Sequence, residues 1–289
     1  MDLRPLVEVD LREALAPINR GNGGLGRFVP AMRTAAQLRE RAAAQVLDLK
    51  LSRACYIGGL VGSCLVERLD EQAHIDAIGI EPLAQQRGAG RALVEAVCQA
   101  AAAAGVKRLS VFVSDFDSTL LSSLAALGFV RRRGVARYIL SGAPAPLTQP
   151  TDLGNGPAPD SATEPYARAV PLAEALPMLH AGVAADKLLF GQQGGILTRL
   201  GGKLTAYTLT TPDSNGQPVA AAVFERERKL IHALGGEPGQ LAHLLCLLAA
   251  RHGVACIEAL VEGHPAQSAL TTAGFQRASL GAELVKDLG

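Results

Sequence analysis

The sequence contains few aromatic residues and little net charge. Its 289 residues include no Trp, four Tyr and seven Phe, and the formal net charge at pH 7 is +1. Surfaces that bind nucleic acid usually combine a strongly basic face with aromatic side chains that stack on the bases. The composition therefore argues against a nucleic-acid partner.

Long hydrophobic runs are also missing. No apolar stretch reaches the roughly 20 residues that a membrane-spanning helix needs. The N-terminal residues Met1, Asp2 and Arg4 do not resemble a signal peptide. We expect a cytoplasmic protein without a membrane partner.

The cysteines are odd in number and widely spaced. The five are Cys55, Cys64, Cys98, Cys246 and Cys256, and each lies in an apolar segment. No two stand at the spacing of a metal-binding pair, and the six His residues form no His-x-x-x-His pattern. The sequence therefore predicts buried, reduced thiols, no disulfide and no metal site.

Length and composition indicate two domains. A chain of 289 residues with 48% hydrophobic content exceeds what one hydrophobic core usually serves. Between positions 141 and 165 the sequence turns to Pro, Gly, Ser, Thr and Asp, a composition typical of a linker. We expect a first domain at 1–140, a linker at 141–165 and a second domain at 166–289.

The two halves are related to each other. A shift of 148 residues aligns 93–106 with 241–254 at six identities in fourteen positions, and Glu-Pro precedes both segments. This pattern indicates a tandem duplication of one α/β unit. The copies differ in one respect, since ten residues separate Pro82 from Leu93 and only two separate Pro238 from Leu241.

A glycine-containing segment follows an expected strand at 75–80. It reads Gln85-Gln86-Arg87-Gly88-Ala89-Gly90-Arg91 and opens an expected helix at 91–104. Glycines let a ligand approach the backbone closely, and the free N–H groups at a helix start favour an anion. A purely structural turn is the alternative, because Gly-x-Gly alone is a weak signal. The segment lacks the Gly-Lys-Ser/Thr ending of a triphosphate site, and Leu93 replaces the third glycine of a dinucleotide site.

In its context the segment resembles the GNAT superfamily of acyl-CoA-dependent N-acyltransferases. The resemblance covers about 3–140, and its parts are Ile78-Gly79-Ile80-Glu81-Pro82, the glycine segment, a helix stopped at Gly105, a strand at 109–113, and Leu127-Gly128-Phe129. It implies an α/β protein of two GNAT-like domains, each a mixed, mostly antiparallel twisted sheet flanked by helices. The second copy then resembles a degenerate GNAT-like domain that lacks the phosphate loop.

Hydrophobic periodicity predicts the elements of the first domain. Strands are expected at 3–9, 52–57, 60–67, 74–80, 108–113 and 130–140, and helices at 11–18, 34–45, 91–104 and 118–127. Asp117 is expected to cap the last helix and Gly128 to end it.

The resemblance implies acetyl-CoA as a co-substrate. In this family, N–H groups of the glycine segment and the next helix turn face the pyrophosphate. The backbone of two strand residues pairs with the pantetheine, and the N–H of Ile78 lies nearest the thioester oxygen. The residues expected to bind acetyl-CoA are Ile78, Ile80, Gln85, Gln86, Arg87, Gly88, Ala89, Gly90, Arg91 and Asp117. The two isoleucines can also be buried strand residues, because the expected contacts use their backbone.

The catalytic base is expected on the same strand. Simple alternation places His74, Asp76 and Ile78 on one face. The family often has a carboxylate at the position matched by His74, four residues before Ile78. An imidazole with an unperturbed pKa of about 6.5 can accept a proton from the amine directly or through water. The alternative is a polar residue at the strand start that faces solvent.

The acid departs from the family pattern. Many members have an Asn after the fifth strand and a Tyr on the next helix, at positions matched here by Asp117 and Leu124. Leu124 cannot donate a proton, and the neighbouring Ser122 and Ser123 are expected to lie on the helix surface. A CoA thiol with a pKa near 8.5 can leave as a thiolate without help. The departure thus weakens the enzyme hypothesis without removing it.

Two further segments have competing interpretations. Arg131, Arg132 and Arg133 could meet a CoA phosphate, but a solvated face on an edge strand is favoured. The glycine-rich stretch 21–26 resembles a second phosphate loop, yet it lies where this family has an acceptor-binding loop.

We therefore expect an acetyl-CoA-dependent N-acetyltransferase that acts on a primary amine of a small molecule or peptide by direct attack. The alternative is a non-catalytic acyl-CoA-binding or scaffold protein, suggested by Leu124 and the shortened second copy. The sequence does not identify the acceptor, and it leaves a homodimer open.

Overall fold

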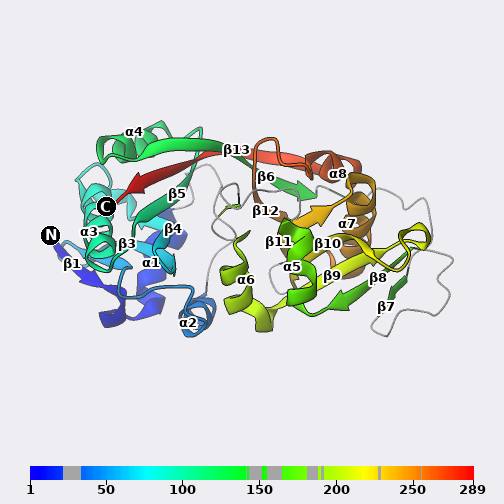
Figure 1. The fold of residues 1–289 in the computed structure, drawn as a ribbon. Coiled ribbons are helices and arrows are strands. Elements are labelled where there is room, and N and C mark those ends of the chain that lie inside the picture. The colour runs from blue at the N-terminus through cyan, green and yellow to red at the C-terminus, as the bar shows by residue number, and fades with distance from the viewer. Residues whose placement is uncertain are drawn as a thin grey trace. The chain divides into compact units, whose positions relative to one another are not determined.

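The structure is a computed structural model that describes most of the chain as two compact units. It describes residues 1–21, 34–140, 142, 152–154, 165–180, 188–189, 192–226, 229–254 and 256–289. The first unit comprises Met1–Val135 with Ser279–Gly289, and the second comprises Ala136–Ala278 (Figure 1). The glycine-rich stretch after Gly21 and most of the expected linker lie outside the described residues.

The first unit contains one mixed sheet. Its strands are β1 (Asp2–Pro5), β2 (Arg53–Tyr56), β3 (Leu60–Leu69), β4 (Gln72–Ile80), β5 (Arg108–Ser114) and the end of β13 (Phe275–Asp287). They follow the order β1-β2-β3-β4-β5-β13. Only β4 and β5 pair in parallel, and the other neighbours are antiparallel. The predicted mixed, mostly antiparallel sheet is confirmed.

Helices cover both faces of this sheet (Figure 1). They are α1 (Leu11–Gly21), α2 (Ala35–Ala43), α3 (Ala89–Ala103) and α4 (Ser118–Ala126). One core lies under α3 and includes Leu93, Val97 and Val111, and the other lies under α1 and includes Leu15, Ile18 and Leu65. The predicted elements agree with these bounds except at the first strand, which ends at Pro5 and continues as a 3-10 turn, Leu6–Glu8.

The second unit repeats the plan. Its strands are β8 (Tyr166–Val170), β9 (Leu204–Thr210), β10 (Pro218–Glu225), β11 (Leu230–Gly236) and β12 (Cys256–Val261), with β7 (Asp152–Gly154) beside β8. Their order is β12-β11-β10-β9-β8-β7, and its helices are α5 (Leu172–His180), α6 (Gly194–Leu200), α7 (Pro238–His252) and α8 (Gln267–Thr272). The segments that join the units lie within β6 (Val130–Leu140) and β13.

A close helix-to-strand approach occurs in both units. A Cβ at Gly79 of β4 would lie 2.3 Å from the Ile18 Cα of α1. A Cβ at Gly235 of β11 would lie 2.4 Å from the Met178 carbonyl oxygen of α5. Both helices carry an internal proline just before the contact, Pro17 in α1 and Pro177 in α5. The shared detail supports the duplication indicated by the sequence.

The end of β13 completes the sheet of the first unit. Positions from Gly281 to Asp287 pair with β5, and Leu284 is buried in the α3-side core. Glu283 is 3% exposed and its carboxylate lies 2.5 Å from Arg133 Nε. The solvated face expected for the arginine run is therefore wrong for Arg133, whose side chain is 12% exposed. Arg131 pairs at the surface with Asp115.

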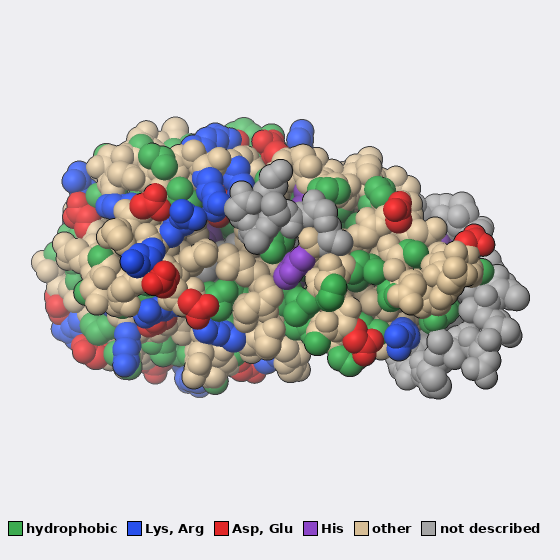
Figure 2. Space-filling model, viewed as in Figure 1, with side chains coloured by type: hydrophobic (Ala, Val, Ile, Leu, Met, Phe, Trp, Pro, Cys, Tyr) green, Lys and Arg blue, Asp and Glu red, His purple; other side chains and the backbone are tan. Residues whose placement is uncertain are grey.

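The remaining sequence expectations concern thiols and surface. All five cysteines are free, and all but Cys256 are buried. Burial raises the pKa of the Cys55, Cys64, Cys98 and Cys246 thiols. No described helix is long and apolar enough to cross a membrane. On the face drawn in Figure 2, acidic and basic side chains are interspersed over the first unit.

The core position of Leu284 yields a stability prediction. Leu284→Ala removes a side chain that is 4% exposed in the first unit, and we expect a loss of about 2–5 kcal/mol in the free energy of unfolding. Asp287→Ala is the control on the same strand, because its exposed ion pair with Arg108 contributes at most about 1 kcal/mol. Denaturant unfolding measures both. Equal, small losses would contradict a core role for β13.

Candidate active site

The glycine segment forms a turn of free backbone donors between β4 and α3. Helix α3 begins at Ala89, and its N-cap is Gly88, with φ +80°. Gln86 also has positive φ, at +60°. The first helical bond runs from the Ala92 N–H to the Gly88 carbonyl. No acceptor in the described part of the chain is recorded for the N–H groups of 86–91, so six consecutive donors are available for an anion.

The side chains around this turn support its shape. The backbone N–H of Gln85 donates to the carbonyls of Glu81 and Pro82, and its side-chain amide donates to the Ile80 carbonyl at 3.2 Å. Gln85 therefore holds the turn rather than offering its own N–H to a ligand. Arg87 is exposed, and Arg91 forms an exposed pair with Glu95 at 2.9 Å.

Strand β4 leaves β5 before this turn. The parallel pairing covers only 72–75 with 108–111, and no strand of the described residues pairs with β4 beyond Ile75 on that side. Glu81 donates its N–H to the Val61 carbonyl, which fixes the alternation of bonds to β3. The main-chain groups of Ile78 and Ile80 therefore point away from β3, toward the side that β5 has left. This is the edge that the pantetheine was expected to meet.

A β-bulge interrupts β4 at Asp76. Ile75 pairs with Val66 and Ala77 pairs with Leu65, so Asp76 has no partner on β3. An extra residue reverses the alternation of side chains beyond it. The prediction that His74 shares a face with Ile78 is therefore wrong, because His74 lies on the Leu65 face and Ile78 on the Cys64 face.

His74 is a buried residue, not a solvent-facing one. Its side chain is 6% exposed, its ring packs at a tilt 4.5 Å from the Phe112 ring, and Nδ1 lies 2.9 Å from Ser110 Oγ. The Ser110 hydroxyl donates its single proton to the Ala73 carbonyl. Nδ1 must then donate its N–H to the Ser110 oxygen, and this bond fixes the orientation of the ring. Asp76 is half-buried.

The start of α4 has the predicted cap. The Asp117 carboxylate accepts from the Leu120 N–H at 2.9 Å and is 8% exposed. Leu124 is 1% exposed and belongs to the α3-side core. The Ser123 hydroxyl donates to the Thr119 carbonyl within the same helix. These positions therefore offer no hydroxyl to a leaving thiolate.

The second unit has a β-bulge at the equivalent strand position but no counterpart of the glycine turn. His232 occupies the bulge of β11, since Ile231 pairs with Phe224 and Ala233 with Val223. Its imidazole lies 2.7 Å from the Glu225 carboxylate, and both residues are buried. Helix α7 begins at Pro238, directly after its N-cap Glu237. Pro238 has no N–H, and the Leu241 N–H already donates to the Glu237 carbonyl. Only the N–H groups of Gly239 and Gln240 are therefore free at this helix start, compared with six in the first unit.

Comparisons with known proteins identify the family. Residues 35–134, within the first unit, match the model of the acetyltransferase (GNAT) family. No match was found among curated protein sequences. The first unit is therefore a GNAT domain.

Solved structures match nearly the whole chain. A candidate acetyltransferase from Pyrococcus horikoshii is 11% identical with a TM-score of 0.66, and the match covers 99% of this chain and 89% of that one. A tandem GNAT protein from the clavulanic acid biosynthesis pathway is 17% identical with a TM-score of 0.65, covering 97% and 95%. A GCN5-related N-acetyltransferase from Sphaerobacter thermophilus is 16% identical with a TM-score of 0.61, covering 88% and 86%. At these identities the likeness establishes the fold, which is that of a tandem GNAT protein.

Two glycines at the site should respond differently to a methyl group. Gly79→Ala brings Cβ against α1 backbone atoms, and we expect a loss of about 1–3 kcal/mol in unfolding free energy. Gly90→Ala meets only Ile80 Cγ1, at 3.6 Å, and should leave the fold as stable as the parent. Thermal unfolding compares the two, and a destabilised Gly90→Ala would contradict the described turn.

Proposed function

We propose that the first unit binds acetyl-CoA and transfers its acetyl group to a primary amine of a small molecule or peptide. The observation that carries this proposal is the row of six free N–H groups at 86–91, next to the β4 edge that β5 leaves. Backbone donors at a helix start suit a pyrophosphate. GNAT family membership makes acetyl transfer the natural reaction for such a site.

The cofactor-binding residues follow from this arrangement. The pyrophosphate is assigned to the N–H groups of 86–91, and the pantetheine to the backbone of Ile78 and Ile80. Arg87 is exposed, and we assign it the role of adding a positive charge beside the phosphates. Gln85 and Asp117 act indirectly, by holding the turn and the start of α4.

The reaction is a direct acyl transfer. The amine nitrogen attacks the thioester carbon, and the N–H of Ile78 stabilises the oxyanion of the tetrahedral intermediate. Collapse of the intermediate forms the amide and breaks the C–S bond. The CoA thiolate leaves with the electron pair and is later protonated by water, because Leu124 offers no acid. The buried thiols with raised pKa are poor nucleophiles, which favours this route over a covalent intermediate.

His74 is our candidate for the base. The bond between Nδ1 and Ser110 orients the imidazole, which we assign as the base that takes a proton from the ammonium, directly or through water. The His74 side chain is buried and lies on the opposite face of the sheet from that of Ile78, so we expect the proton to pass from the amine to His74 through water. Asp76 at the bulge, beside the backbone of Ile78, is the next candidate.

An amine panel tests the activity. Purified full-length protein is incubated with acetyl-CoA and primary amines, including small molecules and peptide N-termini, and free CoA thiol is measured. Amine-dependent thiol release supports the transferase. Saturable CoA binding without transfer to any amine favours the rival, a non-catalytic acyl-CoA-binding or scaffold protein, for which buried Leu124 is the supporting observation.

The glycine turn yields a binding prediction. Calorimetry should find one CoA site per chain in the parent, because the second unit has two free donors where the first has six. Gly90→Asp should abolish binding, since it adds a negative charge where N–H groups meet phosphate. Gly90→Ala is the matched control for side-chain bulk without charge. Unchanged affinity in a folded Gly90→Asp variant, or two equivalent sites per chain, would overturn this assignment.

His74 yields a kinetic prediction. His74→Asn keeps a group that can hydrogen-bond to Ser110 but removes the base, so kcat should fall by about 10²-fold while CoA affinity stays unchanged. Ser110→Ala is the control for the hydrogen bond alone. Equal rates in parent and His74→Asn across neutral to alkaline pH would assign the base to Asp76 or water.

A further inference from the structure

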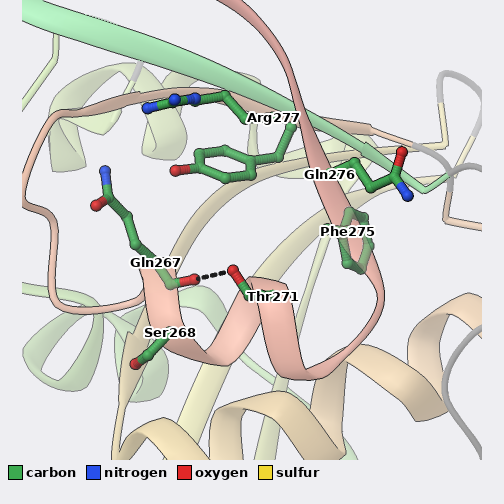
Figure 3. A pocket seen from close by; sticks show the side chains of 7 residues that line it. Gln267, Ser268, Thr271, Phe275, Gln276 and Arg277 are labelled. Atoms are coloured by element: carbon green, nitrogen blue, oxygen red, sulfur yellow. Dashed lines mark hydrogen bonds between the residues drawn. The ribbon is translucent and has the colours of Figure 1, made fainter.

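The second unit contains a pocket that lies apart from the proposed CoA site. Its volume is about 480 Å³, and its walls come from β6, α8 and the start of β13. The lining residues are Tyr138, Gln267, Ser268, Thr271, Phe275, Gln276 and Arg277 (Figure 3). This volume is in the range of small-molecule sites.

The pocket has hydrogen-bond donors without partners. Arg277 is exposed, and no ion pair or hydrogen bond of its guanidinium is recorded within the described residues. Tyr138 is 6% exposed, and its hydroxyl likewise has no recorded partner there. Figure 3 shows the Arg277 and Gln267 side chains extending toward the same space from β13 and α8, while Gln276 points away from them. The Thr271 hydroxyl is used within the helix, where it donates to the Gln267 carbonyl.

The only charge among the lining residues is positive. Arg277 is the only ionised side chain among the lining residues, and none of them is acidic. Burial raises the pKa of Tyr138, the charge of Arg277 opposes this shift, and the carboxylate of Glu262, outside the lining, adds to it. The phenol therefore stays protonated at neutral pH and can donate a hydrogen bond. A guanidinium and a phenol on one wall suit a carboxylate, which accepts both.

Part of the pocket lining is apolar. Phe275 and Tyr138 both line the cavity, and their rings are largely buried, at 3% and 6% exposed. A bare inorganic anion has no apolar atoms to pack against these rings, whereas the hydrophobic part of an organic acid does. We propose that this pocket of the second unit binds a small organic carboxylate, with its charge on Arg277 and Tyr138 and its apolar part against Phe275.

Benzoate is the probe for this site, used with the full-length chain and ligand-observed NMR titration. Benzamide, its neutral analogue of the same shape, tests the need for charge, and inorganic phosphate tests the need for an apolar part. We expect saturable benzoate binding with a dissociation constant on the order of 1 mM, and at least fivefold weaker binding of benzamide and phosphate.

Variants locate the binding. Arg277→Gln should weaken benzoate binding at least fivefold and Tyr138→Phe at least twofold. Arg226→Gln, another exposed arginine of the second unit, is the matched control and should bind as the parent does. Gly90→Asp should also bind normally, which separates this pocket from the CoA turn.

Three results would overturn the proposal. The first is absence of saturable benzoate binding at 20-fold the expected constant. The second is equal binding by Arg277→Gln and Arg226→Gln when both variants unfold at the parent's temperature. The third is Arg277-dependent phosphate binding as tight as that of benzoate, which would define a bare anion site instead.

Discussion

The separation of β4 from β5 after Ile75 is the constraint on which the site depends. Two parallel strands that stayed paired would satisfy each other's backbone groups and leave none for a ligand. Here the pairing stops after four residues, and the Asp76 bulge follows at once on the other edge of β4. The main-chain groups of Ile78 and Ile80 are thereby left without a strand partner just before the glycine turn, and only the Ile80 carbonyl is recorded with another partner, the Gln85 side chain. The proposed recognition of a thioester arm by these groups needs hardly any side chain, so it is compatible with isoleucine at both positions.

The second unit shows which part of this arrangement a duplicated copy can lose. It keeps the short parallel ladder, the bulge and the contact between helix and strand glycine. It lacks only the segment between the strand and the helix, and with it four of the six free donors. A frame of this kind is stabilised by core packing, so it does not depend on the segment that supplies the free donors. The buried His232–Glu225 pair gives its bulge a different polar environment from that of Asp76.

Local signals in the sequence predicted local features well. The two glycines marked the turn, Asp117 and Gly128 marked the ends of α4, and periodicity placed the helices to within a few residues. The bulge could not be seen this way, because the pattern of His74 to Ile80 fits unbroken alternation. Non-local pairing was equally hidden. Nothing near Arg133 indicates Glu283, 150 residues away, and nothing near Tyr138 indicates Arg277.

The last strand has a consequence for the order of folding. Residues 279–289 belong to the first unit but are synthesised after the whole of the second. During translation β5 therefore lacks the neighbour that seven paired positions later provide, and Leu284 is missing from the core. Domains usually fold as they emerge, N-terminal first. Until these last residues have been synthesised, β5 is an open edge of the first unit's sheet.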